Sequence, residues 1–315
     1  MKRVLITSRS FGMASDEPYR MLERAGFDVT HIKIFTDEEF LQAATGIDAL
    51  ILGVNPFGPR ELRVCPNLKI IARYGAGVNN IDLPAIKASG IPVTYLPGVN
   101  TNAVADYTIG LILDASRNIS GVRHTVLGGA YEYTTGKDVY GKTLGLVGFG
   151  AVGQAVARRA KGFSMRILAY DPFVQQIPAE FQGNVTLCDR QTVTTQSDII
   201  SIHAALTDET RDMFNKTTIR TMKQDAVLIN TARGGIVNEQ DLYDCMRTGH
   251  LFAAALDVQQ NEPIERDNPL LTLGNVIITP HAATVTRETI DAMSTICAQN
   301  VINAFTGKTL QYPLI

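Results

Sequence analysis

One stretch near the middle of the chain, from Lys142 to Asp171, constrains the fold more than any other. A short apolar run leads into the turn GFGAVG, from Gly148 to Gly153. A helical pattern and a second apolar run follow, and that run ends at Asp171. A strand, G-x-G-x-x-G, a helix, a strand and an acid in this order form the dinucleotide-binding fingerprint. The glycines allow a tight turn and a close approach of backbone to a pyrophosphate, and the acid can accept from a ribose hydroxyl. We therefore predict a parallel α/β sheet that binds a dinucleotide.

The composition limits the classes of protein to which the chain can belong. Its 315 residues suggest about two domains, and 45% hydrophobic residues allow ordinary cores. The formal net charge of −2 argues against nucleic acid or an anionic membrane as a partner. No apolar run reaches the roughly 20 residues of a membrane span, and the N-terminus predicts a strand rather than a signal peptide. Four widely spaced cysteines without C-x-x-C argue against structural zinc and disulfides, so we expect a cytoplasmic protein with no bound metal.

The first hundred residues alternate short β-like runs with helical patterns. Such alternation predicts a parallel sheet with helices on both faces, which is a doubly wound α/β domain of about five strands. A long helix is predicted from Asn100 to Arg117, and residues 118–141 look like an irregular surface connection or an arm to a partner subunit. The predicted strands of this half are 4–7, 29–32, 49–52, 69–72 and 92–95.

The second half repeats the βα alternation and predicts a second parallel sheet of six or seven strands. A final helix is predicted over residues 286–305. The predicted strands are 143–147, 165–170, 185–187, 198–203, 226–230, 252–256 and 276–279.

Four polar residues follow three of these strands and can carry chemistry. Arg233 lies in NTARGG, Asp257 and Glu262 lie in ALDVQQNEP, and His281 lies in TPHAA. Taken singly, each could be a salt-bridge partner, a solvated acid or a helix-cap neighbour. The carboxyl ends of parallel strands meet at one edge of a sheet, which is also where the glycine turn lies. We therefore expect these residues to share one site.

Together these motifs resemble the D-isomer-specific 2-hydroxyacid dehydrogenase family, and in particular its phosphoglycerate-dehydrogenase-like branch. The resemblance covers nearly the whole chain and includes RYGAGVNNID at 73–82 and SIHAALTDET at 201–210. It implies a Rossmann NAD-binding domain, roughly 101–285, inserted into a flavodoxin-like substrate domain of residues 1–100 completed by 286–315. It also implies a cleft between the two domains and a homodimer.

The resemblance further implies an oxidoreductase that transfers a hydride between NAD(H) and a D-2-hydroxyacid or 2-ketoacid. His281 would exchange the hydroxyl proton, Glu262 would orient the imidazole and favour imidazolium, and Arg233 would bind the substrate carboxylate. The implied substrate-binding residues are Tyr74, Gly75, Ala76, Gly77 and Asn100. The implied cofactor-binding residues are Val104, Gly148, Gly150, Ala151, Val152, Gly153, Asp171, Pro172, His203, Ala204, Thr210, Thr231, Ala232, Arg233, Asp257, His281 and Ala283.

Asp171 favours NAD over NADP, because a carboxylate repels a 2′-phosphate and residues 172–174 offer no arginine. Glu262 separates the chain from formate dehydrogenases, which resemble the family but carry Gln there. Because the chain ends at Ile315, we expect no serine-sensing regulatory domain.

Two departures from the phosphoglycerate-dehydrogenase pattern leave the substrate open. Gly53-Val54-Asn55-Pro56 stands where an Arg-Ser pair is frequent, and Asn79 stands where Asp is usual. Either 3-phosphoglycerate is bound with help from Arg60, Arg63 or Arg73, or the substrate is glyoxylate, hydroxypyruvate or another 2-ketoacid. The family fold also serves as a non-enzymatic NADH-sensing corepressor, which is the alternative from a different functional class.

Overall fold

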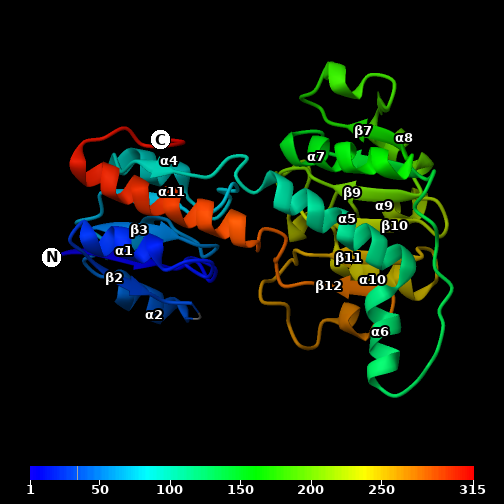
Figure 1. Cartoon of the computed structure of the whole chain (residues 1–315), viewed down its shortest axis with the longest axis horizontal. Helices are drawn as coiled ribbons and strands as arrows, with labels where there is room; N and C mark the ends of the chain where they lie inside the picture. The colour runs from blue at the N-terminus through cyan, green and yellow to red at the C-terminus, as the bar shows by residue number, and fades with distance from the viewer. Residues whose placement is uncertain (34) are drawn as a thin grey trace. The chain divides into compact units, whose positions relative to one another are not determined.

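The computed structural model describes residues 1–33 and 35–315. The chain forms two compact units. Unit 1 contains Met1–Asn100 and Thr284–Ile315, and unit 2 contains Thr101–Ala283. Each unit is a parallel sheet with helices packed against it (Figure 1), which confirms the predicted two-sheet α/β fold. Within the described residues, no helix combines the length and apolar character that a membrane span requires.

Unit 1 contains a five-stranded sheet in the order β2-β1-β3-β4-β5, with all pairs parallel. This is the flavodoxin-like order, in which the chain adds strands first on one side of β1 and then on the other. The strands are β1 (Lys2–Ile6), β2 (Phe27–His31), β3 (Ala49–Leu52), β4 (Ile70–Arg73) and β5 (Val93–Thr94), and the helices are α1 (Glu17–Arg24), α2 (Asp37–Ala44), α3 (Pro59–Leu62), α4 (Leu83–Ser89) and α11 (Arg287–Thr306).

Alternate residues of each strand enter two separate cores, one on each face of this sheet. In β1, Val4 and Ile6 pack with Leu22 of α1 and Met293 of α11. Leu5 lies on the opposite face, in the core that includes residues of α2 and α4. Every residue of the central strand β3 is buried, so it reads as a continuous apolar run, whereas the edge strand β2 alternates. Figure 1 shows α1 and α11 side by side on the first of these faces.

The C-terminal segment belongs to unit 1 through its backbone as well as its side chains. The amide of Leu314 donates to the carbonyl of Val93 at 2.7 Å, and the amide of Tyr95 donates to the carbonyl of Tyr312 at 3.2 Å. The tail therefore lies alongside β5 at the edge of the sheet, where it satisfies backbone groups that an edge strand leaves unpaired.

Unit 2 contains a seven-stranded parallel sheet in the order β12-β11-β10-β9-β6-β7-β8. The order reverses between β6 and β9, and this switch point is where open α/β sheets bind ligands. The strands are β6 (Thr143–Val147), β7 (Arg166–Tyr170), β8 (Val185–Leu187), β9 (Ile199–Ile202), β10 (Val227–Asn230), β11 (Ala253–Leu256) and β12 (Val276–Ile278), and the α-helices are α5 (Thr101–Arg117), α6 (Ile119–Leu127), α7 (Ala151–Ala160), α8 (Arg190–Gln196), α9 (Lys216–Thr221) and α10 (Glu239–Arg247).

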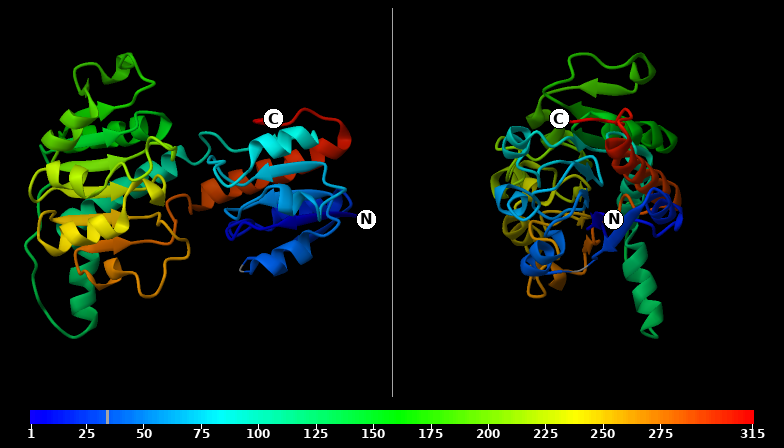
Figure 2. Two further views of the ribbon diagram at one scale, coloured as in Figure 1. Left: turned by 180° about the vertical axis from the view of Figure 1, so that it is seen from behind. Right: turned by 90° about the vertical axis from the view of Figure 1, so that its left-hand side faces the viewer.

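The second sheet also has a core on each face. Ile229 of β10 joins the core under α5 and α7, and its neighbour Leu228 joins the core under α9 and α10. Figure 1 shows α5 and α7 in front of this sheet, and the view from behind in Figure 2 brings α10 (yellow) to the front. The two helix layers cover both faces of the sheet. The predicted site residues lie on the loops at its edge.

The prediction that residues 118–141 are irregular was wrong for their first part, because Ile119–Leu127 forms the helix α6. Asn118 takes a left-handed conformation (φ 51°) and separates this helix from α5. No residue of α6 is buried. Its apolar residues Ile119, Val126 and Leu127 are therefore exposed rather than packed in a core.

The cysteines of the described chain are free thiols, and three of them are buried. Burial raises the pKa of Cys65 to about 11 and that of Cys297 to about 12. A thiol with such a pKa carries almost no thiolate at neutral pH. These residues therefore act as packing side chains.

Candidate active site

The sequence motifs meet at one edge of the seven-stranded sheet. The glycine turn follows β6, His203 follows β9, Arg233 lies in the turn after β10, Asp257 follows β11 and His281 lies in the turn after β12. Because all five strands are parallel, these positions lie at the carboxyl edge of the same sheet.

The glycine turn leaves no room for side chains at two of its positions. Gly148 has φ +99°, and a Cβ there would lie 2.6 Å from the backbone of His203. A Cβ at Gly153 would lie 2.2 Å from the carbonyl oxygen of Gly148. Gly150, by contrast, precedes α7 as its N-cap and faces open space. Backbone N–H groups at this helix start are therefore accessible to a pyrophosphate.

Asp171 lies beside this turn and is held there by backbone donors. One carboxylate oxygen accepts from the amide of Phe149 at 2.8 Å, and the other accepts from the amide of Phe173 at 2.9 Å. A carboxylate oxygen has two acceptor positions, so both oxygens retain capacity for a ribose hydroxyl. The residues GFGAVG and Asp171 thus fit the pyrophosphate and ribose of a dinucleotide.

Asp257 organises the turn that carries His281. Its Oδ1 accepts from Thr279 Oγ1 at 2.6 Å and from the amide of Ala282 at 2.8 Å, and its Oδ2 accepts from the amide of Ala283 at 2.9 Å. Burial raises the pKa of Asp257, although these hydrogen bonds and the charge of His281 oppose the shift. The amide of His281 donates to the Asp257 carbonyl at 2.8 Å, and His281 adopts φ +55°. A positive φ is uncommon for residues other than glycine, and these bonds maintain it here.

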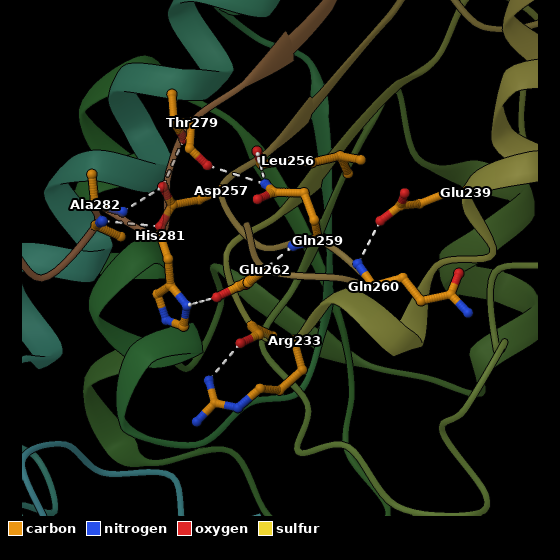
Figure 3. Close-up of polar contacts among 12 residues, drawn as sticks. Arg233, Glu239, Leu256, Asp257, Gln259, Gln260, Glu262, Thr279, His281 and Ala282 are labelled. Atoms are coloured by element: carbon orange, nitrogen blue, oxygen red, sulfur yellow. Dashed lines mark hydrogen bonds and ion pairs between the residues drawn. The ribbon is translucent and has the colours of Figure 1, made fainter. Parts of the chain in front are cut away.

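The imidazole of His281 is paired with Glu262. Its Nδ1 lies 2.8 Å from Glu262 Oε2 (Figure 3). Burial works against ionisation of Glu262, but the hydrogen bond and charge of His281, the amide of Gln259 and the charge of Arg233 outweigh it and lower the pKa of Glu262. Glu262 is therefore a carboxylate at neutral pH, and it orients the ring so that Nε2 is left for a ligand.

Arg233 is placed by the turn that follows β10. Buried Asn230 holds this turn, because its Nδ2 donates to the Arg233 carbonyl at 2.8 Å and its Oδ1 accepts from the amide of Ala232 at 3.0 Å. The guanidinium donates to the Ala232 carbonyl at 2.6 Å. Burial lowers the pKa of Arg233 and the charge of Glu262 opposes this, so the group remains a cation. In Figure 3 the guanidinium and the imidazole of His281 extend toward the same side.

Several predicted cofactor-binding side chains have partners within unit 2. The hydroxyl of Thr231 lies 2.9 Å from that of Thr108 in α5, and the ring of His203 lies 2.9 Å from the hydroxyl of Ser201. Burial lowers the pKa of His203 to about 3, so this ring is neutral near pH 7. Thr210 donates to the carbonyl of Ala205 in its own loop. Val104 and Ala283 are buried, whereas Ala151, Val152, Pro172, Ala204 and Ala232 keep some exposure.

The predicted substrate-binding residues at 74–77 follow β4 in unit 1. The Tyr74 side chain points into the unit 1 core, where its hydroxyl lies 3.2 Å from that of Ser294. Only the backbone of Tyr74 is therefore placed to contact a ligand. Gly75 has φ +146°, and Asn100 ends the first segment of unit 1.

Sequence reasoning missed the residues that support the site. Asn230 bonds to backbone groups of the turn that carries Arg233. Gln259 Nε2 donates to the carbonyl of Leu256 and, in the loop after β12, to that of Thr279, at 3.1 Å each. The one available signal was the position of these amides near strand ends, because Asn230 is the last residue of β10 and Gln259 lies three residues beyond β11. Within the described residues, no group of three or more His, Cys, Asp or Glu side chains is arranged to hold a metal ion.

Comparison with known proteins gives consistent matches. The family model described as D-isomer specific 2-hydroxyacid dehydrogenase, NAD binding domain, matches residues 109–283. A D-3-phosphoglycerate dehydrogenase of Methanocaldococcus jannaschii is 36% identical over 311 residues, which cover 98% of this chain and 58% of that protein. A glyoxylate reductase of Korarchaeum cryptofilum is 40% identical over 262 residues, which cover 81% of this chain and 79% of that protein.

A solved structure resembles nearly the whole chain. The TT0316 protein of Thermus thermophilus superimposes with a TM-score of 0.90 at 34% identity, covering 99% of this chain and 100% of that one. The chain spans only 58% and 56% of the D-3-phosphoglycerate dehydrogenases of M. jannaschii and Archaeoglobus fulgidus.

The turn after β10 generates a stability prediction. A Cβ at Gly234 would lie 1.9 Å from the carbonyl oxygen of Gln259, whereas a Cβ at Gly235 would meet only side-chain atoms at 3.4 Å. We expect Gly234→Ala to lower the free energy of unfolding by about 1–3 kcal/mol, as overpacking does. Gly235→Ala is the matched control and should change it by less than about 1 kcal/mol. Urea unfolding measures both, and equal effects of the two substitutions would contradict the packing described.

Proposed function

The chain belongs to the D-isomer specific 2-hydroxyacid dehydrogenase family, and we propose that it catalyses NAD-dependent interconversion of a D-2-hydroxyacid and its 2-ketoacid. The observation that carries this proposal is the pair formed by His281 and Glu262, with Arg233 extending to the same side. A protein that only senses the cofactor has no need of a proton-transfer pair next to a carboxylate-binding cation.

The proposed roles follow from the chemistry of each group. When bound, NAD accepts or donates a hydride. His281 Nε2 takes the hydroxyl proton in oxidation and returns it in reduction, because imidazole serves as base or acid near neutral pH. Glu262 favours the imidazolium form and fixes the ring. Arg233 binds the substrate carboxylate, ideally through two parallel N–H donors, and so positions the reacting carbon.

We propose that unit 2 is the NAD-binding domain and that unit 1 selects the substrate. The accessible helix start after Gly150 would hold the pyrophosphate, and Asp171 would accept from the ribose. Asp257 would accept from the nicotinamide carboxamide with the acceptor position that its three donors leave open. In unit 1, the backbone of Gly75, Ala76 and Gly77 would bind the substrate carboxylate.

Contacts in unit 1 favour an unphosphorylated substrate over 3-phosphoglycerate. Arg60 lies 3.1 Å from Asp37, and the guanidinium of Arg73 donates to the carbonyl of Gly77 at 2.9 Å and to that of Tyr74. Arg73 is also only 6% exposed. Two of the three arginines that could replace the missing Arg-Ser pair are therefore already engaged. Arg63 remains exposed beyond the end of α3. Glyoxylate and hydroxypyruvate thus become the first substrates to test.

We further propose a cytoplasmic homodimer, formed through α6 and the segment 128–141 that follows it. This part of the chain exposes Leu127, Tyr131, Tyr133 and Tyr140, with exposed fractions from 65% to 86%. Figure 1 shows α6 extending away from the sheet of unit 2. Exposed aromatic and aliphatic residues gathered in this way are typical of a protein interface.

Turnover tests the proposed activity directly. We expect the protein to oxidise NADH with glyoxylate or hydroxypyruvate, and His281→Ala to lower kcat by about 10²–10⁴, the usual contribution of a general acid–base. NADH absorbance at steady state measures this, with D-3-phosphoglycerate and NAD tested in the oxidative direction. Tight NADH binding without turnover of any substrate would instead support the corepressor-like alternative.

The choice of cofactor follows from Asp171. The carboxylate repels a 2′-phosphate, so we expect kcat/KM to be at least about 100-fold higher with NADH than with NADPH. Asp171→Asn keeps an acceptor for the amide of Phe149 but removes the charge. It should lower the ratio of kcat/KM with NADH to kcat/KM with NADPH by at least about tenfold. Equal kcat/KM values of the wild type with the two cofactors would contradict the assignment.

The dependence of reduction on pH follows from Glu262. Its lowered pKa keeps it ionised above acidic pH, where its charge stabilises the proton on His281. Glu262→Gln removes this charge from the pair. Reduction needs protonated His281. The alkaline limb of the kcat profile should therefore move to lower pH, by about 1 unit if the pair contributes about 1.4 kcal/mol. An alkaline limb that stays in place or moves upward would show that Glu262 does not act on His281.

The oligomeric state can be changed at one residue. We expect light scattering after gel filtration to give twice the chain mass of 34.3 kDa for the wild type. Leu127→Glu should give a monomer, because a buried unpaired charge costs several kcal/mol. Leu271→Glu, which alters an exposed leucine elsewhere in unit 2, is the control and should remain dimeric. A wild-type monomer at micromolar concentration would refute the proposal.

A further inference from the structure

We propose that Glu239, the first residue of α10, is a positioning residue that acts through the Gln259–Gln260 peptide to hold Glu262 on His281. The proposal rests on the proposed function, because it assigns a task within the same proton-transfer pair. Glu239 touches neither His281 nor Glu262, and its effect depends on the loop between β11 and η4 (Pro269–Thr272).

Both carboxylate oxygens of Glu239 are used on this loop. Oε1 accepts from the amide of Gln260 at 2.5 Å, and Oε2 accepts from Asn268 Nδ2 at 2.7 Å. Glu239 is only 8% exposed, and no lysine, arginine or histidine of the described chain forms an ion pair with it. Its place at the start of α10 favours a negative charge. A buried carboxylate is costly without such bonds, and here both bonds go to the segment that flanks Glu262.

The Gln259–Gln260 peptide is held from both sides. On one side Gly234 packs so closely that a Cβ would lie 1.9 Å from the Gln259 carbonyl oxygen. On the other side Glu239 accepts from the Gln260 amide (Figure 3). The amide of Gln259 in turn donates to Glu262 Oε1 at 3.2 Å, while Oε2 of the same carboxylate bonds to His281. Movement of this peptide would therefore change the orientation of Glu262 directly.

A role in starting α10 does not account for Glu239. The helix already has an N-cap, since Asn238 Oδ1 accepts from the amide of Asp241 at 3.0 Å. The charged groups that act on His281 are Glu262, Asp257 and, through Glu262, Arg233. Of the two acids, only Glu262 sits on a loop whose backbone Glu239 binds. A loosened loop should thus weaken the Glu262 contact with the imidazole.

The test follows the imidazole of His281 by NMR as pH is varied, in the full chain without cofactor. The chain has 5 histidines, and the spectrum of His281→Asn identifies the signal. We expect Glu239→Met to lower the titration midpoint of His281 by at least about 0.5 pH unit, since loss of a favourable carboxylate contact makes the imidazole release its proton more easily. Glu239→Asp, which keeps the charge but withdraws the carboxylate by one methylene, should lower it by a smaller amount.

Asp241→Asn is the matched control. Asp241 lies in the same first turn of α10 but accepts from the amide of Lys216 in α9, away from the site. It should leave the midpoint within about 0.2 pH unit of the wild type, roughly the measurement error. An unchanged midpoint in folded Glu239→Met, or in Glu239→Asp if the methionine variant does not fold, would overturn the proposal. So would an equal shift in the control.

Kinetics give a second readout for the same variants. With NADH and the best 2-ketoacid, Glu239→Met should lower kcat about tenfold, a part of the general acid–base contribution, and leave KM for NADH within about twofold. Its alkaline limb should move in the same direction as that of Glu262→Gln. Failure of the proposed function would appear as an inactive wild type, whereas the NMR midpoints would still decide the role of Glu239.

Discussion

The register of the parallel strands in unit 2 is the constraint on which the site depends. Ile202 of β9 pairs with Asn230 of β10, Asn230 pairs with Leu256 of β11, and Leu256 pairs with Ile278 of β12. The next residue of each strand therefore emerges at the same level of the sheet. In β11 this residue is Asp257, and in β12 it is Thr279, which bonds to Asp257. A shift of one residue in either pair would separate these groups and exchange the side chains of the shifted strand between the two cores.

The acids at this edge differ in function because they differ in surroundings. Asp257 is buried and accepts two backbone amides and a hydroxyl, so it mainly fixes the turn that presents His281. Glu262 is partly exposed, and its contact with the imidazole makes it the acid that can change the protonation of a reacting group. Glu239 is buried, as Asp257 is, and it bonds to a loop rather than to the imidazole. Of these three acids, only Glu262 bonds to the imidazole, whereas Asp257 and Glu239 hold the loops around it.

Much of the fold could be predicted, because buried parallel strands are apolar runs with clear ends. The runs at 49–52, 143–147 and 185–187 match β3, β6 and β8 residue for residue. Helix α6 was missed because the Gly and Tyr residues of segment 118–141 favoured an irregular connection throughout, although Ile119, Val122 and Val126 recur at helical spacing. At the site, Arg233, Glu262 and His281 could be chosen as chemically active residue types after strands. Contacts such as that of Gln260 with Glu239 could not, because they join segments 21 residues apart and depend on the course of two loops.

The direction in which a side chain points could not be predicted from the sequence either, and this matters for the choice of substrate. Tyr74 lies in a motif that suggests ligand binding, yet its ring lies in the core of unit 1. In the same unit, Asn80 Nδ2 donates to the carbonyls of Gly53 and Asn55 at 3.1 and 2.7 Å, and Thr7 donates to Asn55 Oδ1 at 2.8 Å. Neutral groups therefore hold the loop where an Arg-Ser pair is frequent in the phosphoglycerate-dehydrogenase pattern. Most of the polar groups of this loop are therefore already engaged within unit 1, and none of the side chains that hold it supplies a positive charge for a phosphate.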